Sequence, residues 1–313
     1  MERLDGGSAI PAALRGGVVA LGNFDGVHRG HQAVVGAAVT RARATGRPAI
    51  VCTFDPHPVR HFNPDAPPFQ LTSVDQRLAL FAAAGADAAM VLHFDTAMAA
   101  MPAADFAAVY LADRLGADHI VTGRDFTFGR GRGGSAQSLA ALGADLGFTA
   151  EAVASVADGA GVVSSSRIRT ALIEGDCEAA AAMLTRPYRI AGIVEHGDKR
   201  GRAIGYPTAN LGLGDYQRPA YGIYAVRGHL ADGRVLGGVA NLGIRPMFDP
   251  PRELLEPYFF DFAEDLYGQR VEVDLISFIR PEARFEGLEA LVRQIDADAA
   301  EARARLAAAP AAG

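Results

Sequence analysis

A chain of 313 residues, of which 50% are hydrophobic and 21% charged, can bury a large core, and its length predicts two domains. The 36 acidic and 30 basic residues are interspersed and leave a net charge of −6, so we expect no nucleic-acid partner, and no apolar run approaches a membrane span. Cys52 and Cys177 are too few for a disulfide framework, and the first 14 residues lack the apolar core of a signal peptide, so we expect a cytoplasmic protein. The only lysine, Lys199, is followed by Arg200, which excludes a Walker A loop.

The first half of the chain alternates short apolar segments with alanine-rich helical segments. The expected strands are 18–24, 49–54, 88–94, 119–122 and 150–156. The expected helices between them are about 30–45, 74–84, 103–115 and 136–146, followed by a helical piece over 166–184. This alternation predicts an α/β domain with a doubly wound parallel sheet, in which ligands bind at the carboxyl ends of the strands.

The second half is rich in short strands that lack helical crossovers. The expected strands are 189–194, 223–230, 235–242, 258–262 and 271–279, and Asp232-Gly233 is a hairpin turn signal. About six such strands predict a small antiparallel barrel, closed by an amphipathic helix over 287–308. The pattern changes near residue 185, so we expect domains at 1–185 and 186–313.

The segment 22–31 joins the first strand to the first long helix through a glycine-rich turn with two histidines. Glycines allow close approach, the free N–H groups of a helix start point toward an anion, and the histidines add donors. The pattern predicts a phosphate site formed by Gly22, Asn23, Phe24, Asp25, Gly26, His28, Gly30 and His31. An HxxH pair can also bind a metal ion, although no cysteine or third histidine lies nearby to complete a zinc site.

Two further loops follow predicted strands in the same half. Asp55 and His57 lie in the proline-containing segment 53–58, where they face the same ligand crevice or form a rigid, capped turn. We expect Pro58 to break any helix that would place His57 and His61 on one face. The segment 123–134 contains a formal GxGxxG pattern that begins several residues beyond the strand, which favours a mobile cationic loop over a dinucleotide fingerprint.

The segment 163–169 places hydroxyl groups and arginines at the start of a helix. Serines there can act simply as N-caps. Arginines in the first turn oppose the helix dipole, and a bound anion would resolve this conflict. A polyphosphate would suit the group formed by Ser165, Ser166, Arg167 and Arg169.

The second half contains a glycine- and arginine-rich loop that leads to the segment 205–211. Thr208 and Asn210 are one residue apart in an extended segment, so both side chains emerge on one face, where they could help to hold Mg²⁺ between phosphates. The loop before them would receive those phosphates; the alternative is a simple turn with a capping asparagine. Glu256, an acid among apolar neighbours, is a candidate general base or a solvated strand residue.

Together these motifs resemble the bifunctional riboflavin kinase/FMN adenylyltransferase family, the prokaryotic FAD synthetases. The resemblance covers roughly 17–306 and rests on GNFDGVHRGH at 22–31, TFDPHP at 53–58, GRDFTFG at 123–129, SSSRIR at 164–169, HGDKRGRAIGYPTANL at 196–211, GVANLGIRP at 238–246 and DLYGQ at 265–269. It implies a nucleotidylyltransferase-like α/β domain followed by a flavokinase-type barrel. ATP, riboflavin, FMN and FAD would be the substrates or products, and Mg²⁺ the cofactor.

By matching position, the resemblance also implies roles for individual residues. His28 and His31 would contact ATP phosphates during adenylyl transfer, and the serines and arginines of 165–169 would hold the polyphosphate. The implied flavin pocket comprises Asp55, His57, Asp125 and Phe126. In the kinase half, Thr208 and Asn210 would bind Mg²⁺ and Glu256 would be the base, while the phosphates would meet Gly197, Arg200, Gly201 and Arg202.

Three residues depart from the family pattern. Met247 stands where threonine is usual, Tyr258 where histidine is usual after the glutamate, and Asp125 where asparagine often appears. The first two departures motivate an alternative, an adenylyltransferase whose barrel only binds a ligand. A non-catalytic flavin carrier is a third hypothesis, disfavoured because both phosphate motifs are complete.

Overall fold

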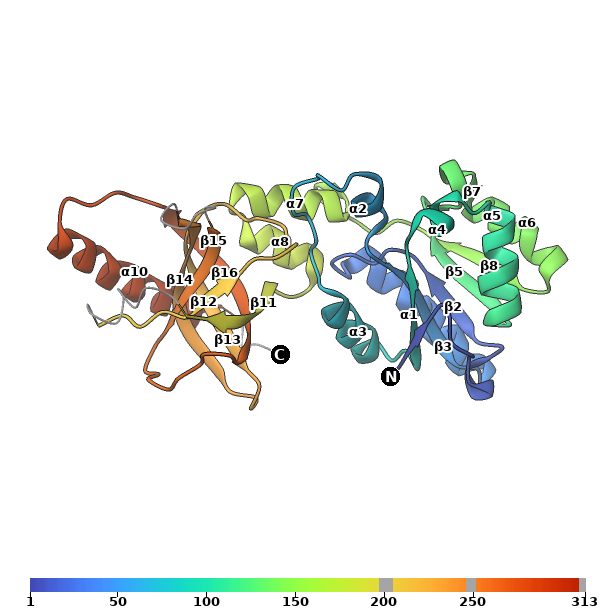
Figure 1. Ribbon diagram of the computed structural model, residues 1–313, viewed down its shortest axis with the longest axis horizontal. Coiled ribbons are helices and arrows are strands. Elements are labelled where there is room, and N and C mark those ends of the chain that lie inside the picture. The colour runs from blue at the N-terminus through green and yellow to red at the C-terminus, as the bar shows by residue number, and fades with distance from the viewer. Residues whose placement is uncertain (197–204, 246–251, 310–313) are drawn as a thin grey trace. The chain divides into compact units, whose positions relative to one another are not determined.

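The computed structural model describes residues 1–196, 205–245 and 252–309 (Figure 1). The chain forms two compact units. One comprises Met1–Pro67 and Thr72–Ser165, and the other comprises Pro68–Leu71 together with the chain from Ser166 onward. Within the described ranges, no helix combines the length and hydrophobicity that a membrane crossing requires.

The first unit is built on a parallel sheet, as the sequence predicts, with six strands where five were expected. Its strands are β1 (Glu2–Asp5), β2 (Val18–Leu21), β3 (Ala49–Asp55), β4 (Ala88–His93), β5 (His119–Gly123) and β8 (Thr149–Val153). They lie in the order β1-β4-β3-β2-β5-β8, and every neighbouring pair is parallel. From β2 the chain builds the sheet outward through β3 and β4, and it then returns to the other side of β2 to form β5. The direction of winding therefore reverses at β2, and such a reversal is where open α/β sheets bind ligands.

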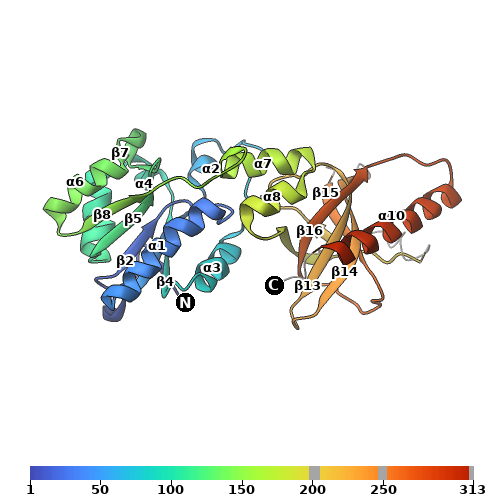
Figure 2. The same cartoon turned by 180° about the vertical axis from the view of Figure 1, so that it is seen from behind.

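Helices cover both faces of this sheet. They are α1 (Arg29–Thr45), α2 (Pro58–Phe62), α3 (Val74–Ala83), α4 (Thr96–Ala100), α5 (Ala103–Phe106), which continues as a wider helix over Ala107–Arg114, and α6 (Ala136–Leu146). Short elements complete the unit: the single 3-10 turns Ala12–Leu14 and Arg130–Arg132, and the two-residue strands β6 (Thr127–Phe128), β7 (Gly134–Ser135), β9 (Ala157–Asp158) and β10 (Gly161–Val162). Figure 2 shows α1 and α3 on one face of the sheet.

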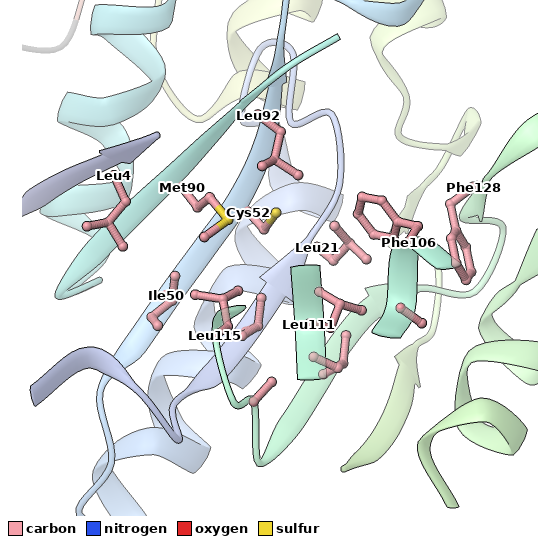
Figure 3. Close-up of a cluster of buried hydrophobic side chains, with 14 of the residues drawn as sticks. Leu4, Leu21, Ile50, Cys52, Met90, Leu92, Phe106, Leu111, Leu115 and Phe128 are labelled. Carbon is pink, nitrogen blue, oxygen red and sulfur yellow. The ribbon is translucent and has the colours of Figure 1, made fainter. Parts of the chain in front are cut away.

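Alternate residues of each strand enter two separate cores. Leu21 and Met90 belong to the core in Figure 3, where they pack with Phe106 and Leu111 from the helix over 103–114. Cys52 is also buried there, and this burial raises the pKa of its thiol to about 12. The intervening strand residues pack against α1 and α3 on the opposite face. Because both faces are covered, the central strands are continuous apolar runs, which explains why the sequence identifies them.

The second unit is a closed antiparallel barrel preceded by two helices and followed by one. The helices are α7 (Ser165–Glu174), whose first residue belongs to the first unit, α8 (Cys177–Leu184) and α10 (Leu288–Ala308). The strands are β11 (Tyr188–Glu195), β12 (Asn210–Gly212), β13 (Gly222–Leu230), β14 (Val235–Arg245), β15 (Arg252–Phe259) and β16 (Arg270–Pro281). They close in the order β11-β12-β15-β14-β13-β16. This architecture confirms the predicted barrel and terminal helix.

The outer and inner faces of the barrel have different packing. On the outer face, Ala302 of α10 packs against Ala225, Val239 and Phe260. On the inner face, the ring of Phe259 lies so close to Gly228 that a Cβ atom there would meet its Cε1 atom at 2.3 Å. The outer face beside α10 is therefore covered, and it also carries the polar residues described below.

Candidate functional site

The histidine turn, residues 22–31, begins at the carboxyl end of β2, where the sheet reverses its winding. Phe24 and Val27 adopt positive φ angles of 52° and 43°, and Gly26 has a φ of 87°. Positive φ is costly for a β-branched residue such as valine, so surrounding contacts must hold this backbone. The turn is a strained segment at the expected ligand-binding edge.

Asp25 is buried at the base of the turn. Its Oδ1 accepts hydrogen bonds from the backbone N–H of Thr72 at 3.1 Å and from the Thr72 hydroxyl at 3.3 Å. The backbone carbonyl of Asp25 accepts a bond from Ser165 Oγ at 2.9 Å. The structure thus brings Ser165 to the histidine turn, and it directs the Asp25 carboxylate inward.

The two histidines stack on each other at the start of α1. Their ring centroids are 3.7 Å apart, with an interplanar angle of 20°. His28 is the N-cap of α1, and its Nδ1 accepts from the backbone N–H groups of Gly30 at 3.2 Å and His31 at 3.4 Å. Because Nδ1 accepts, the proton of a neutral His28 resides on Nε2. These two helix N–H groups are therefore not directed at a ligand, which corrects our expectation for this helix start.

The segment around Asp55 and His57 follows β3, next to the histidine turn. Thr53 Oγ1 donates to the carbonyl of Asn23 at 2.9 Å, which joins the end of β3 to that turn. His57 caps α2, and its Nδ1 accepts from the backbone N–H of Val59 at 3.2 Å. Pro58 starts α2, a position where its missing N–H is not needed, so His57 precedes this helix and His61 lies within it. As we expected, the two histidines do not lie together in one helix.

The segment 123–134, expected as a loop, contains a small hairpin instead. β6 pairs with β7, and the N–H of Arg130 donates to the carbonyl of Met101 at 2.7 Å. A Cβ atom on Gly129 would lie 2.6 Å from the backbone nitrogen of Ala103, so this glycine permits close packing. Asp125 and Phe126 follow the end of β5, the other neighbour of β2 in the sheet.

The remaining predicted polyphosphate residues lie in α7. Ser166 and the two arginines belong to the second unit, whereas Ser165 belongs to the first. Arg169 Nε donates to the carbonyl of Phe69 at 2.8 Å, and its guanidinium lies 5.4 Å from the centre of the Phe69 ring. Arg167 is half-buried.

A second polar cluster lies on the outer face of the barrel. Leu211 pairs with Leu255, so Asn210 lies one residue beyond that pair, alongside Glu256. On the other side of β15, Asn241 is the register partner of Glu256, and its Nδ2 donates to Glu256 Oε2 at 3.4 Å. Directly paired residues on neighbouring strands share a face. Asn210, Glu256 and Asn241 therefore form one row.

Thr208 lies two residues before Asn210 in the segment that leads into β12. The backbone N–H of Ala209 donates to the carbonyl of Pro257 at 2.9 Å, so the extended pairing continues before β12. Tyr258 contacts the ring of Tyr206 edge to face, with centroids 5.1 Å apart. The hydroxyl of Tyr206 donates to Asp296, and this hydrogen bond, with burial, raises the pKa of Tyr206 to about 12.

Sequence reasoning missed Asn241 as an individual residue, although the motif at 238–246 contains it. Its role emerges only from the strand register, which pairs it with Glu256 across fifteen positions of sequence. The predicted phosphate residues Gly197, Arg200, Gly201 and Arg202, as well as Met247, lie outside the described residues.

Comparison with known proteins assigns both halves of the chain. Residues 10–167 match the FAD synthetase family model, and residues 184–306 match the riboflavin kinase family model. A bifunctional riboflavin kinase/FMN adenylyltransferase from Pseudomonas fluorescens is 41% identical over 93% of each chain. The chain belongs to the bifunctional riboflavin kinase/FMN adenylyltransferase family.

Other members of the bifunctional riboflavin kinase/FMN adenylyltransferase family are similarly related. The protein from Escherichia coli K12 is 37% identical over 93% of each chain, and that from Bacillus subtilis is 39% identical over 91% of each. A crystal structure described as a macrolide-efflux protein from Streptococcus pneumoniae is 32% identical, with a TM-score of 0.85, and covers 95% of this chain and 97% of its own. Family membership gives the chain two activities: ATP-dependent phosphorylation of riboflavin to FMN, and adenylylation of FMN to FAD.

Proposed function

We propose that the two activities are divided between two sites, with FMN adenylyl transfer in 1–185 and riboflavin phosphorylation in 186–313. The observation that carries this proposal is that the two polar clusters belong to different compact units. The histidine turn lies within one compact unit, and the row Asn210, Glu256 and Asn241 lies within the other. Each cluster also falls within the matching family model.

In adenylyl transfer, His28 and His31 contact the phosphates of ATP, with His28 donating through Nε2. The glycines of the turn let the phosphates approach the backbone. The other predicted contacts within the first unit are Gly22, Asn23, Phe24, Asp25, Gly26, Gly30 and Ser165. The flavin pocket comprises Asp55, His57, Asp125 and Phe126. These four residues lie at the end of β3 or beyond the ends of β3 and β5, the two neighbours of β2.

In riboflavin phosphorylation, Glu256 accepts the proton of the 5′-hydroxyl. A hydroxyl oxygen and an amide oxygen are suitable ligands for Mg²⁺, and Thr208 and Asn210 supply them beside Glu256. When bound, Mg²⁺ neutralises phosphate charge. Asn241 holds the carboxylate of Glu256 through its hydrogen bond.

Neither reaction requires a covalent enzyme intermediate. The 5′-hydroxyl of riboflavin attacks the γ-phosphorus of one ATP and releases ADP. A phosphate oxygen of FMN then attacks the α-phosphorus of a second ATP and releases pyrophosphate. The residues contribute alignment and charge stabilisation, which accounts for the hydrogen-bond donors of the first cluster and the oxygen ligands of the second. We place this chemistry in the cytoplasm, on small-molecule substrates, without a nucleic-acid or membrane partner.

The test is chromatography of flavins after incubation of the full chain with ATP and Mg²⁺, once with riboflavin and once with FMN. We expect replacement of His28 and His31 by alanine to lower FAD formation from FMN about 10²-fold or more per lost donor. Formation of FMN from riboflavin should persist. Arg47→Ala is the control, because Arg47 joins residues at the amino ends of β2 and β5, on the opposite edge of the sheet.

Two outcomes would contradict the proposal. One is that the histidine variants abolish both activities in folded protein, because the sites would then not be separate. The other is that riboflavin phosphorylation proceeds unchanged when a chelator removes Mg²⁺, because Thr208 and Asn210 would then have no metal to hold.

A further inference from the structure

Arg77 is a buried arginine on α3 that no sequence motif identified. Only 3% of its surface is exposed. Its Nη1 donates to the carbonyl of Asn23 at 3.0 Å, to Thr53 Oγ1 at 3.0 Å and to the carbonyl of Phe54 at 3.2 Å. One guanidinium group therefore joins the histidine turn to the end of β3.

The charge of this side chain is maintained at a cost. Burial lowers the pKa of Arg77 below its ordinary value, while the carboxylates of Asp25 and Asp55 oppose that shift. An arginine remains protonated at neutral pH even after such a shift. An apolar side chain such as Phe81, also on α3, would attach the helix to the sheet without desolvating a charge. The buried arginine therefore calls for an explanation beyond packing.

The bonds of Arg77 belong to a set that fixes the histidine turn residue by residue. Side chains bind the backbone groups around its positive-φ residues. Arg77 and Thr53 bind the carbonyl of Asn23, Ser165 binds that of Asp25 and Gln32 that of Val27, while Thr72 accepts from the N–H of Gly26. This set encloses the positive-φ residues of the turn. A strained backbone conformation persists only where surrounding contacts hold it in place, and such strain is concentrated at functional sites. Arg77 also binds a backbone carbonyl of β3, that of Phe54.

We propose that Arg77 is a positioning residue for adenylyl transfer, which sets the spacing between the histidine turn and the segment that carries Asp55 and His57. This inference rests on the proposed roles of those two segments. Arg77 acts through the carbonyls of Asn23 and Phe54. A displacement of about 1 Å in a reacting constellation can cost about 10²-fold in rate. The loss should appear mainly in kcat, because alignment matters most in the transition state.

The experiment compares Arg77→Met and Arg77→Lys in the full chain, with FAD formation from FMN measured at varied ATP and FMN. We expect Arg77→Met to lower kcat about 10²-fold, with smaller changes in KM. Arg77→Lys retains the charge and part of the hydrogen bonding, so we expect partial rescue. Riboflavin phosphorylation by the same polypeptide should stay at the wild-type rate, which reports that the barrel is folded, and KM values close to wild type report that the α/β unit still binds its substrates.

Arg47→Met is the matched control. Arg47 donates to the carbonyl of Gly16 at 2.8 Å and pairs with Asp118 at 3.0 Å, so it joins residues that precede β2 and β5. It therefore ties the strands at their amino ends, opposite the proposed site. We expect its replacement to leave the kcat for FAD formation close to wild type.

Three results would overturn the role of Arg77. One is that Arg77→Met forms FAD from FMN with the wild-type kcat. Another is that Arg47→Met shows the same loss of kcat as Arg77→Met. The third is an equal loss of riboflavin phosphorylation in both Arg77 variants, which would indicate general destabilisation. The histidine variants, assayed in parallel, separate this failure from a failure of the proposed site. If the histidine variants retain adenylyl transfer, the proposed site is wrong. If the histidine variants lose adenylyl transfer while Arg77→Met remains active, only the positioning role of Arg77 is rejected.

Discussion

Replacing Glu256 by glutamine removes the proposed base of the kinase reaction while the shape of the side chain is retained. A positioned general base typically contributes about 10²- to 10⁴-fold to a rate. This corresponds to about 3–5 kcal/mol of transition-state stabilisation. We therefore expect riboflavin phosphorylation to fall by two to four orders of magnitude in this variant.

The structural cost of the same substitution is small. The carboxylate of Glu256 accepts a hydrogen bond from Asn241 at 3.4 Å, and the amide oxygen of a glutamine can accept the same bond. Even complete loss of one hydrogen bond costs about 1 kcal/mol, which a domain stable by about 5–15 kcal/mol tolerates. Unfolding therefore cannot account for a loss of the expected size.

The assay follows FMN formation from riboflavin and FAD formation from supplied FMN in the same preparation. Glu253→Gln is the matched control, because Glu253 lies on the same strand and its carboxylate instead accepts from Arg218 Nε at 2.8 Å. We expect this control to phosphorylate riboflavin near the wild-type rate. An undiminished rate in Glu256→Gln would refute the assignment of the base, and an equal loss of both activities would refute the separation of the sites.

Two predictions concern the stability of the barrel. Burial raises the pKa of Asp274, but hydrogen bonds from His229 and Arg189 have the larger effect and hold the pKa below the ordinary 3.8. The Asp274 carboxylate therefore stabilises the folded barrel above pH 3.8, and this contribution to the free energy of unfolding disappears as the pH falls through the lower, folded-state pKa. Asp274→Asn should lower the free energy of unfolding at pH 7 by about 3 kcal/mol in urea titrations, and a deficit that does not shrink in acid would contradict this. Gly228→Ala would place a Cβ atom 2.3 Å from Cε1 of Phe259, and should cost about 1–3 kcal/mol, measured as a lower melting temperature; an unchanged melting temperature would show that the barrel interior can yield there.

The sequence predicts the central elements of the α/β unit because their strands are buried on both faces. It misses β1, in which only Leu4 is buried, so no apolar run marks this edge strand. It also starts β15 six residues late, at 258 instead of Arg252. The polar residues Glu253 and Glu256 interrupt the apolar pattern there. Where one face of a strand carries charged groups, hydrophobic periodicity does not delimit it.

The candidate site divides in the same way between local and distant signals. The motif around His28 and His31 is contiguous, so the sequence locates it. That His28 itself caps α1 depends on a rotamer, which the motif does not specify. The contact between Asp25 and Thr72 joins residues 47 positions apart, and those of Arg77 span up to 54. No regular spacing in the sequence identifies such partners, because only tertiary packing brings them together.

The chemistry of the two nucleophiles explains why the two clusters contain different residues. A phosphate oxygen of FMN is already anionic, so adenylyl transfer needs donors and alignment rather than a base. The 5′-hydroxyl of riboflavin is neutral and must lose a proton, which calls for a carboxylate such as Glu256. This difference predicts that Glu256→Gln should suppress phosphorylation and leave the pH profile of adenylyl transfer unaltered. A changed profile for FAD formation from FMN in that variant would mean that the barrel carboxylate takes part in both reactions.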